Sequence, residues 1–376
     1  MLKYHKSGDE IDYKKIPKMS VEREVAQDYT PCGPNVLQKI VKGTTLADFQ
    51  AYLATLEDSG FDKCVENVLG DSVWNASYTK GNLILTVIQM VKRNQTYITI
   101  GQNTPLSEHL FYKQEYVACN SDDAKTKLHM LELHTYGNSF IIQLKNGHFI
   151  LDDAGMPADT LYLLDYLEQL APEGETPIIE GWFISHGHGD HFGPLCVLDE
   201  PPEFTKRIIV EGIYFSETAD SGETVQQGVR GMRNCRTGSG DITPIYRPQA
   251  GQRYYFNDIT IDIVHTQEQL LLEEYDNGFN DSSTWFLFTI DGQTFLDGGD
   301  ASEGSINVVK NSYNQAFFDF DMLSVFHHGQ NVYQSYINYF KYKTAIYPTF
   351  VVGSQTANHK TIENYILQKN AEECIS

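Results

Sequence analysis

The sequence lacks any long apolar run. The longest candidate, Leu83–Val91, is interrupted by Thr86 and Gln89, whereas a helix needs about 20 apolar residues in succession to span a bilayer. The N-terminal residues 1–6 carry no apolar segment behind their charges, so an export signal is not predicted. We therefore expect a cytoplasmic chain that has no membrane contact.

Cysteine is scarce and scattered. Six cysteines are spread over 376 residues without a Cys-x-x-Cys pair. A chain of this size without an export signal rarely relies on disulfides. We expect reduced thiols that pack as small apolar residues, and neither a disulfide framework nor a cysteine metal site.

Basic residues are few compared with acidic ones. The chain has 28 Lys and Arg against 50 Asp and Glu, for a formal charge of −22. A surface this negative repels phosphate backbones at long range, which argues against nucleic acid as a partner. A small phosphate ester remains compatible as a substrate, because a metal centre supplies strong local positive charge. Association into a homo-oligomer is left open.

Histidine is also sparse, yet three of the 12 histidines fall within six residues, at His186, His188 and His191. The stretch reads His-Gly-His-Gly-Asp-His and directly follows the apolar run Ile178–Ser185. Neutral imidazole and carboxylate are ligands that zinc, iron and manganese accept. Four such groups at the end of a predicted buried strand can hold two metal ions. A solvated polar loop is the less favoured interpretation.

Residues 1–120 are predicted to form a small α+β domain. The first 30 residues are polar and weakly patterned, which predicts a loosely docked arm. A capping-box start at Thr45, an apolar stripe and a stop at Gly60 predict a helix. Strand patterns follow at Val73–Thr79, Leu83–Val91 and Thr96–Ile100. This domain carries no ligand cluster, so capping the active site or mediating dimerisation are both open roles.

Residues 121–376 are predicted to form a second domain from two similar halves. The hairpin Ser139–Asp152 resembles the hairpin Ser283–Asp297, and both end in acidic residues. Between them we expect a helix with apolar Leu161, Leu164, Leu167 and Leu170, and then the strand before His186. Another strand at Arg207–Phe215 and another helix at Thr224–Met232 should follow. Two such halves predict facing sheets with helices outside, an αββα sandwich; chance similarity is the alternative.

Two facing sheets need metal ligands from both halves. His265 ends the predicted strand Ile259–Val264, and Asp300 follows the strand Thr294–Leu296. The pair His327 and His328 closes a third apolar run, Met322–Phe326. Each lies at the C-terminal end of a strand, where loops carry chemistry on a rigid scaffold. Together with the histidine-rich stretch they form one predicted set.

These motifs, in this order, resemble those of the metallo-β-lactamase-fold hydrolase superfamily over about residues 128–346. Four segments are most similar to the hydrolase domain of bacterial competence (DNA-uptake) proteins: Val264–His265, Asn280–Ser283, Phe295–Asp300 and His327–Gly329. The resemblance implies an αββα sandwich with a dinuclear site. Asp300 in place of a cysteine, and His188 in place of a glutamate, set the chain apart from Cys-ligand zinc β-lactamases and flavo-diiron oxidoreductases.

Carried over by position, the resemblance implies a complete ligand set. One ion would be held by His186, His188 and His265. The second ion would be held by Asp190, His191 and His328, with Asp300 as the bridge. The alternative to His328 is His327, which could also donate a proton. Asp153 would support the site without binding metal, with Asp152 and Asp297 as competitors for that role. Zinc is the expected metal, and manganese or iron also fit.

The predicted activity is metal-dependent hydrolysis. Two ions roughly 3.5–4 Å apart can bridge a water and lower its pKa from about 15.7 toward about 7, and the hydroxide then attacks the substrate. Asp190, Asp300 and His327 are the predicted catalytic residues; Ser185 is expected to orient a ring, and Tyr214 is a second candidate proton donor. A phosphodiester or related ester is the leading substrate, on the competence-type resemblance. A lactone, thioester or amide hydrolase is the first alternative. A non-catalytic effector-binding protein that retains the metal site is the other.

Overall fold

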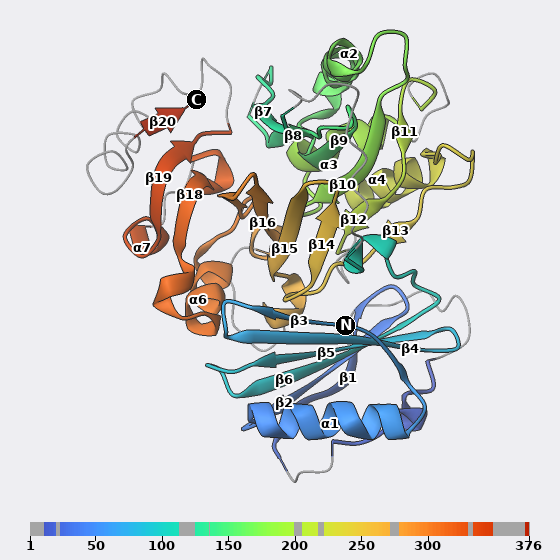
Figure 1. Cartoon of the computed structure of the whole chain (residues 1–376), viewed down its shortest axis with the longest axis vertical. Coiled ribbons are helices and arrows are strands. Elements are labelled where there is room, and N and C mark those ends of the chain that lie inside the picture. Colours follow the sequence, from blue (N-terminus) through green and yellow to red (C-terminus); the bar gives the residue numbers. More distant parts are fainter. Residues whose placement is uncertain are drawn as a thin grey trace.

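Three β-sheets organise the described part of the chain (Figure 1). The computed structural model describes residues 11–19, 23–112, 125–134, 136–198, 205–216, 222–270, 278–329, 334–348 and 373–375. The predicted domain boundary between residues 120 and 121 lies outside the described residues.

The first sheet is antiparallel and has the strand order β1-β2-β6-β5-β4-β3. Its strands are β1 Val25–Gly33, β2 Val36–Lys42, β3 Asp62–Leu69, β4 Val73–Lys80, β5 Leu83–Met90 and β6 Gln95–Gln102. Helix α1, Leu46–Asp58, covers one face. The helix starts as predicted: the Thr45 hydroxyl accepts from the Asp48 amide, and the Asp48 carboxylate accepts from the Thr45 amide at 2.8 Å.

Three of these strands differ from the sequence prediction. Residues 25–30, expected in a loose arm, belong to β1, and β2 and β3 were not predicted. In β1 most side chains are exposed or half-buried, because it is an edge strand that pairs only with β2. A polar edge strand carries little hydrophobic periodicity, so its pairing partner decides its structure.

The second sheet has the order β13-β12-β10-β9-β8-β7, with β11 beside β10. Helices α2 Thr160–Leu170, α3 Gly189–Val197 and α4 Glu223–Asn234 cover its outer face. In α2 the buried apolar residues are Leu163, Leu164 and Leu167, whereas Leu161, expected in the stripe, is 54% exposed. The strands are β7 Lys127–Met130, β8 Ser139–Gln143, β9 Phe149–Asp153, β10 Ile178–Ile184, β11 Ile209–Val210, β12 Ile213–Phe215 and β13 Ile245–Tyr246.

The third sheet runs in sequence order from β14 to β20. Its hairpins turn at Asn257-Asp258 and Asp291-Gly292. The strands are β14 Arg253–Phe256, β15 Ile259–His265, β16 Trp285–Ile290, β17 Gln293–Asp297, β18 Asp319–Ser324, β19 Lys341–Ile346 and β20 Glu373–Ile375. The helices of this half are α5 Gly278–Asp281, α6 Glu303–Ser312 and α7 Gln334–Ile337.

The second and third sheets pack face to face. Their inner residues form one core, in which the rings of Phe140 and Phe295 lie 4.9 Å apart and those of Phe183 and Phe286 5.4 Å apart. Alternate residues of the same strands point outward to the helices. The predicted αββα sandwich is therefore the fold of this part of the chain. The similar hairpins, β8–β9 and β16–β17, each sit beside a parallel strand, β10 and β18.

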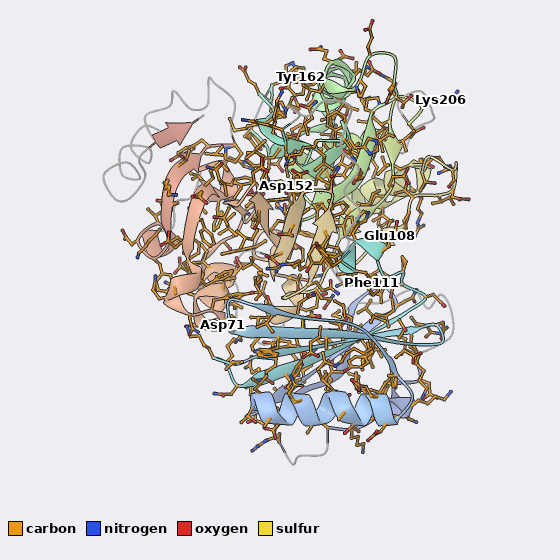
Figure 2. All side chains as sticks on the ribbon, in the orientation of Figure 1. Asp71, Glu108, Phe111, Asp152, Tyr162 and Lys206 are labelled. Carbon is orange, nitrogen blue, oxygen red and sulfur yellow. The ribbon has the colours of Figure 1, made fainter. Side chains whose placement is uncertain are left out.

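The first sheet packs against the outer layer of the third sheet. Tyr97 and Met90, on the face opposite α1, share a core with Val309 and Tyr313 at the end of α6. The Asn75 amide also donates to the carbonyl of Ala250 at 2.8 Å. Figure 2 shows Phe111 near the junction of the two parts.

No helix of the described residues is both long enough and apolar enough to cross a membrane.

Candidate metal centre

Six of the predicted ligands converge in two groups that share one carboxylate. The first group is His186, His188 and Asp300, and the second is Asp190, His191, Asp300 and His328. Within each group the ligand atoms all lie within 4.8 Å of one another. These residues come from the ends of β10, β17 and β18, so both sheets contribute to the site.

The loop after β10 supplies four of these residues in a compact turn. His188 is the N-cap of α3, and Asp190 and His191 lie in the first turn of that helix. On the other sheet, Gly299 adopts a φ of +54° between Asp297 and Asp300. A Cβ at Gly299 would lie 2.7 Å from the Ser185 side chain, so only glycine permits this approach of the two loops.

Asp300 is positioned to bridge the two groups. Its Oδ2 lies 3.7 Å from His186 Nε2, and His186 Nε2 lies 3.0 Å from His188 Nδ1. Its Oδ1 lies 3.1 Å from both His191 Nε2 and His328 Nε2. One carboxylate oxygen thus faces each group, as a bridging ligand requires.

The turn that carries His327 and His328 has an unusual backbone. Both residues have left-handed conformations, with φ of 54° and 53°, and Gly329 follows with φ of 70°. Such conformations cost free energy in residues other than glycine, and they persist where surrounding contacts impose them, often at functional sites. The turn directs His328 Nε2 to 3.3 Å from Asp190 Oδ2 and His327 Nε2 to 3.6 Å from Asp300 Oδ2.

Asp153 supports the ligands from behind. Its Oδ2 lies 2.7 Å from His191 Nδ1, and it accepts hydrogen bonds from the Ser185 hydroxyl at 2.7 Å and the Asn138 amide at 3.0 Å. Ser185 Oγ also lies 3.1 Å from His186 Nδ1. The far nitrogen of each ring is thereby engaged, which fixes the orientation and leaves Nε2 facing the centre.

The two competitors of Asp153 lie deeper. Asp297 accepts from the Asn138 amide at 2.8 Å and from the Gly299 amide at 3.2 Å. Asp152 is fully buried between the sheets (Figure 2). Burial, with the neighbouring Asp297 and Asp153 carboxylates, raises the pKa of Asp152 well above its usual range. Of the three, Asp153 is therefore the one in contact with a ligand ring.

The charge states of the histidines suit divalent cations. Burial lowers the pKa values of His186 and His188, so both rings are neutral and offer a lone pair. For His191, burial acts in the same direction, but Asp300, Asp153 and Asp190 hold its pKa well above the usual value. His191 Nε2 and Asp300 Oδ1 are both buried, and although they lie 3.1 Å apart, neither has a well-directed hydrogen bond. A cation between them would take the place of the proton, so the donor set fits a metal.

The structure does not bring His265 into either group. Its ring lies 6.0 Å from that of Trp285, and the charged side chains that act on it belong to Asp281, Arg93 and Glu268. Without His265 the first group offers three protein ligands, so an ion held there would keep a coordination position for water or substrate.

Tyr214 is also away from the centre. It is buried in the core between the sheets, and its hydroxyl lies 2.7 Å from that of Ser107. It is therefore excluded as a proton donor to a substrate.

Several residues around the centre were not predicted from the sequence. Two aromatic rings lie beside the centre, one next to each ligand group. The ring of Phe279 lies 5.5 Å from that of His188, and the ring of Tyr136 lies 6.1 Å from that of His328. Ser283 Oγ lies 3.3 Å from His186 Nδ1 and accepts from the Asp300 amide at 3.2 Å. The motif Asn280–Ser283 had signalled Ser283, whereas nothing in the sequence singles out Phe279, Tyr136 or Asn138.

Comparison with known proteins gives only distant matches. No family model matches the chain, and no curated protein is similar to it. One similar solved structure is a metallo-β-lactamase with an HARLDQ motif from Cronobacter sakazakii, 16% identical over 53% of this chain and 73% of that one, with a TM-score of 0.32.

Two further solved structures are of the same type. Tm1679, a metal-dependent hydrolase of the β-lactamase superfamily, is 11% identical over 67% of this chain and 93% of its own, with a TM-score of 0.38. BJP-1, a subclass B3 metallo-β-lactamase of Bradyrhizobium japonicum, is 16% identical over 56% and 78%, with a TM-score of 0.32. Likeness this distant assigns no function to this chain.

Proposed function

We propose that the chain is a metal-dependent hydrolase that uses two divalent ions, zinc in the first instance. The observation that carries the proposal is the position of Asp300, whose two carboxylate oxygens face two separate groups of imidazole and carboxylate ligands. Bound ions would lower the pKa of a shared water toward about 7 and polarise a substrate oxygen.

The residues of the chain hold and orient the reactants. Asp190 is partly exposed, with 13% of its side chain accessible, so one carboxylate oxygen can accept a hydrogen bond from the attacking water. His327 is 15% exposed beside Asp300. Because burial lowers the pKa of His327, its ring is neutral and suits a hydrogen bond to a substrate oxygen.

We further propose a phosphodiester or related ester as the substrate. Support comes from the contact of Ser283 with His186, because Ser283 belongs to the segment that resembles competence-type hydrolases. The rings of Phe279 and Tyr136 also suit a substrate with an apolar or aromatic group on either side of the reacting bond. The charge of −22 favours a small ester over nucleic acid. The thiols of Cys32, Cys64, Cys196 and Cys235 are free, consistent with a cytoplasmic location.

The test measures metal content and hydrolysis on the same preparation. After zinc or manganese supplementation we expect about two ions per chain, with hydrolysis of bis(p-nitrophenyl) phosphate exceeding that of p-nitrophenyl phosphate and a simple lactone. His188→Ala should abolish the diesterase activity. His148→Ala is the matched control, because His148 pairs with Glu180 outside both ligand groups.

Each outcome bears on a separate part of the proposal. Less than one ion per chain, or diesterase activity that survives His188→Ala, overturns the dinuclear hydrolase. Cleavage of the lactone alone replaces the phosphodiester with the alternative ester class. A fully metallated protein that is inert to all three substrates favours an effector-binding protein.

A further inference from the structure

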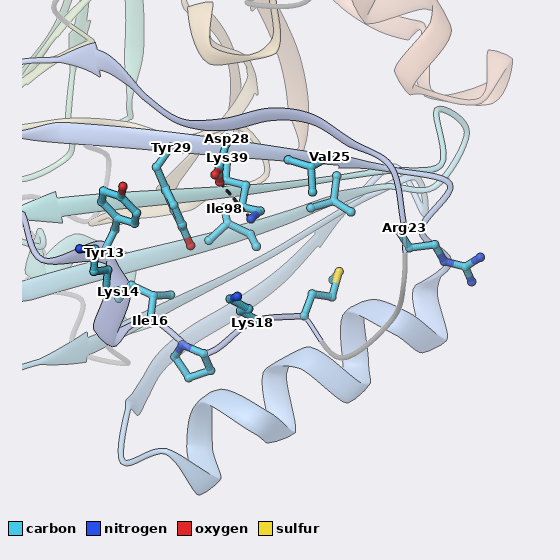
Figure 3. A pocket seen from close by; sticks show the side chains of 13 residues that line it. Tyr13, Lys14, Ile16, Lys18, Arg23, Val25, Asp28, Tyr29, Lys39 and Ile98 are labelled. Atoms are coloured by element: carbon cyan, nitrogen blue, oxygen red, sulfur yellow. Dashed lines mark hydrogen bonds and ion pairs between the residues drawn. The ribbon is translucent and has the colours of Figure 1, made fainter.

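A cavity of about 590 Å³ lies in the N-terminal part of the chain, away from the metal centre (Figure 3). It lies over β1 and β2, on the same face of the first sheet that α1 covers. The opposite face of that sheet packs against the outer layer of the third sheet. The cavity is therefore separated from the metal centre by the sheet itself.

The cavity exists because one helix cannot cover six strands. The buried residues of α1 pack on the central strands, against Leu85, Val87 and Ile100. The segment of residues 11–19 instead covers β1 and β2. Ile16 anchors this segment in the core, and the Pro17 carbonyl accepts a hydrogen bond of 3.0 Å from the Tyr52 hydroxyl. A segment held at these points spans the sheet edge without filling the space beneath it.

The floor of the cavity is apolar. Val41 and Ile98 are buried there. Val25 and Tyr13 also line it, and they remain 46% and 40% exposed, which makes them two of the few large apolar side chains that are exposed among the described residues. Apolar groups left accessible in a concave site favour an apolar ligand there.

The rim carries an excess of positive charge on a protein of net charge −22. Lys14, Lys18, Arg23 and Lys39 line the cavity, against a single carboxylate, Asp28. Lys39 pairs with Asp28 at 3.0 Å, and Arg23 pairs with Asp48 at 3.1 Å. Lys14 and Lys18 form no hydrogen bond or ion pair with any residue that the structure describes. In Figure 3 the amine of Lys18 lies on the side of the cavity nearer α1, facing Tyr29 and Ile98 on the sheet.

We propose that this cavity binds a small amphipathic anion, with its apolar body on Val41, Ile98 and Val25 and its anionic head at Lys18 and Lys14. A volume of about 590 Å³ is in the range of small-molecule sites. The head can be a carboxylate or a phosphate, because a lysine binds either as a point charge. The inference is independent of the metal centre.

The experiment titrates the whole chain with decyl compounds below their micelle concentrations, by isothermal titration calorimetry. Decanoate and decyl phosphate should bind, and the stronger of the two identifies the head group. Decyltrimethylammonium and decanol should bind at least about tenfold more weakly, because they lack the negative charge. Octanoate should bind about tenfold more weakly than decanoate, since it lacks two buried methylenes.

Three variants locate the site. Lys18→Glu should weaken decanoate binding about tenfold by replacing an attraction with a repulsion, and Val25→Ser should weaken it about threefold through lost apolar contact. Lys15→Glu is the matched control, because Lys15 is 76% exposed, lies three residues before Lys18 in the same segment and does not line the cavity. All three side chains are exposed, so each variant should keep the parent melting temperature.

The proposal is overturned if no anionic decyl compound binds at millimolar concentration. It is also overturned if decanol binds as tightly as decanoate, or if Lys15→Glu weakens binding as much as Lys18→Glu. Binding that disappears only when metal is removed would place the ligand at the metal centre, and would likewise refute this site.

Discussion

Replacing Asp153 with asparagine removes one negative charge from behind the metal centre while it keeps the side-chain shape. Asp153 has a φ of 56°, a conformation that asparagine tolerates, so the backbone can stay as it is. The carboxylate accepts from the Ser185 amide, the Ser185 hydroxyl and the Asn138 amide, and it contacts His191 Nδ1. Four donors therefore point at one side chain.

The expected magnitude follows from these contacts. The amide of an asparagine has one acceptor oxygen, and its NH₂ group would face the Ser185 amide or the other three donors. At least one buried donor loses its partner, and each such loss costs about 1–3 kcal/mol in the free energy of unfolding. The ring of His191 also loses the carboxylate that fixes its orientation. Loss of such a supporting group lowers metal affinity about 10–100-fold.

The assay is a metal titration of Asp153→Asn in competition with a chromophoric chelator. We expect weaker binding of one ion, and activity that returns when metal is raised by the same factor. Asp262→Asn is the control, because Asp262 is also a buried carboxylate but pairs with Arg253 at 2.7 Å, away from the centre. Parent affinity for both ions in Asp153→Asn, or equal metal loss in the control, would refute the supporting role.

Three further predictions concern single residues. Burial lowers the pKa of His265 from 6.5 to about 4, so between these pH values the unfolded state binds one proton more than the folded state. The free energy of unfolding therefore falls by about 3 kcal/mol as the pH drops from about 6.5 to 4. In urea unfolding, His265→Gln should show a flatter dependence of this free energy on pH, and its metal content should be unchanged. Although burial opposes it, Asp300 and Asp190 raise the pKa of His328 to about 9 in the metal-free chain. Calorimetry should therefore show the affinity for the second ion rising about tenfold per pH unit up to about pH 9; a pH-independent affinity would contradict this. Phe279→Ala should raise KM for bis(p-nitrophenyl) phosphate several-fold with little change in kcat, whereas Tyr112→Ala, at a 70% exposed position, should change neither.

Local signals in the sequence predict much of the fold. The capping residues of α1 and the turn residues of three hairpins act within a few positions, so they can be recognised without knowledge of the rest of the chain. The similarity of Ser139–Asp152 to Ser283–Asp297 also predicts the arrangement of the sheets, because two similar hairpins indicate two equivalent sheets. The edge strands β1 and β3 escape prediction because most of their side chains are exposed or half-buried, and β2 escapes it because it pairs with the distant β6, which no local pattern records.

The position of His265 illustrates what a strand-end motif leaves undetermined. Ile261 and Ile263 face the core between the sheets, so simple alternation along β15 places His265 on the same inner side as the metal ligands. The pairing of β15 with β16 shifts register between Ile263 and His265, and His265 then pairs with Trp285, whose ring belongs to the outer core. A shift of this kind reverses the side to which a residue points. The register shift depends on how β15 pairs with β16. The sequence of β15 alone therefore does not distinguish a metal-binding histidine from a buried histidine that binds no metal.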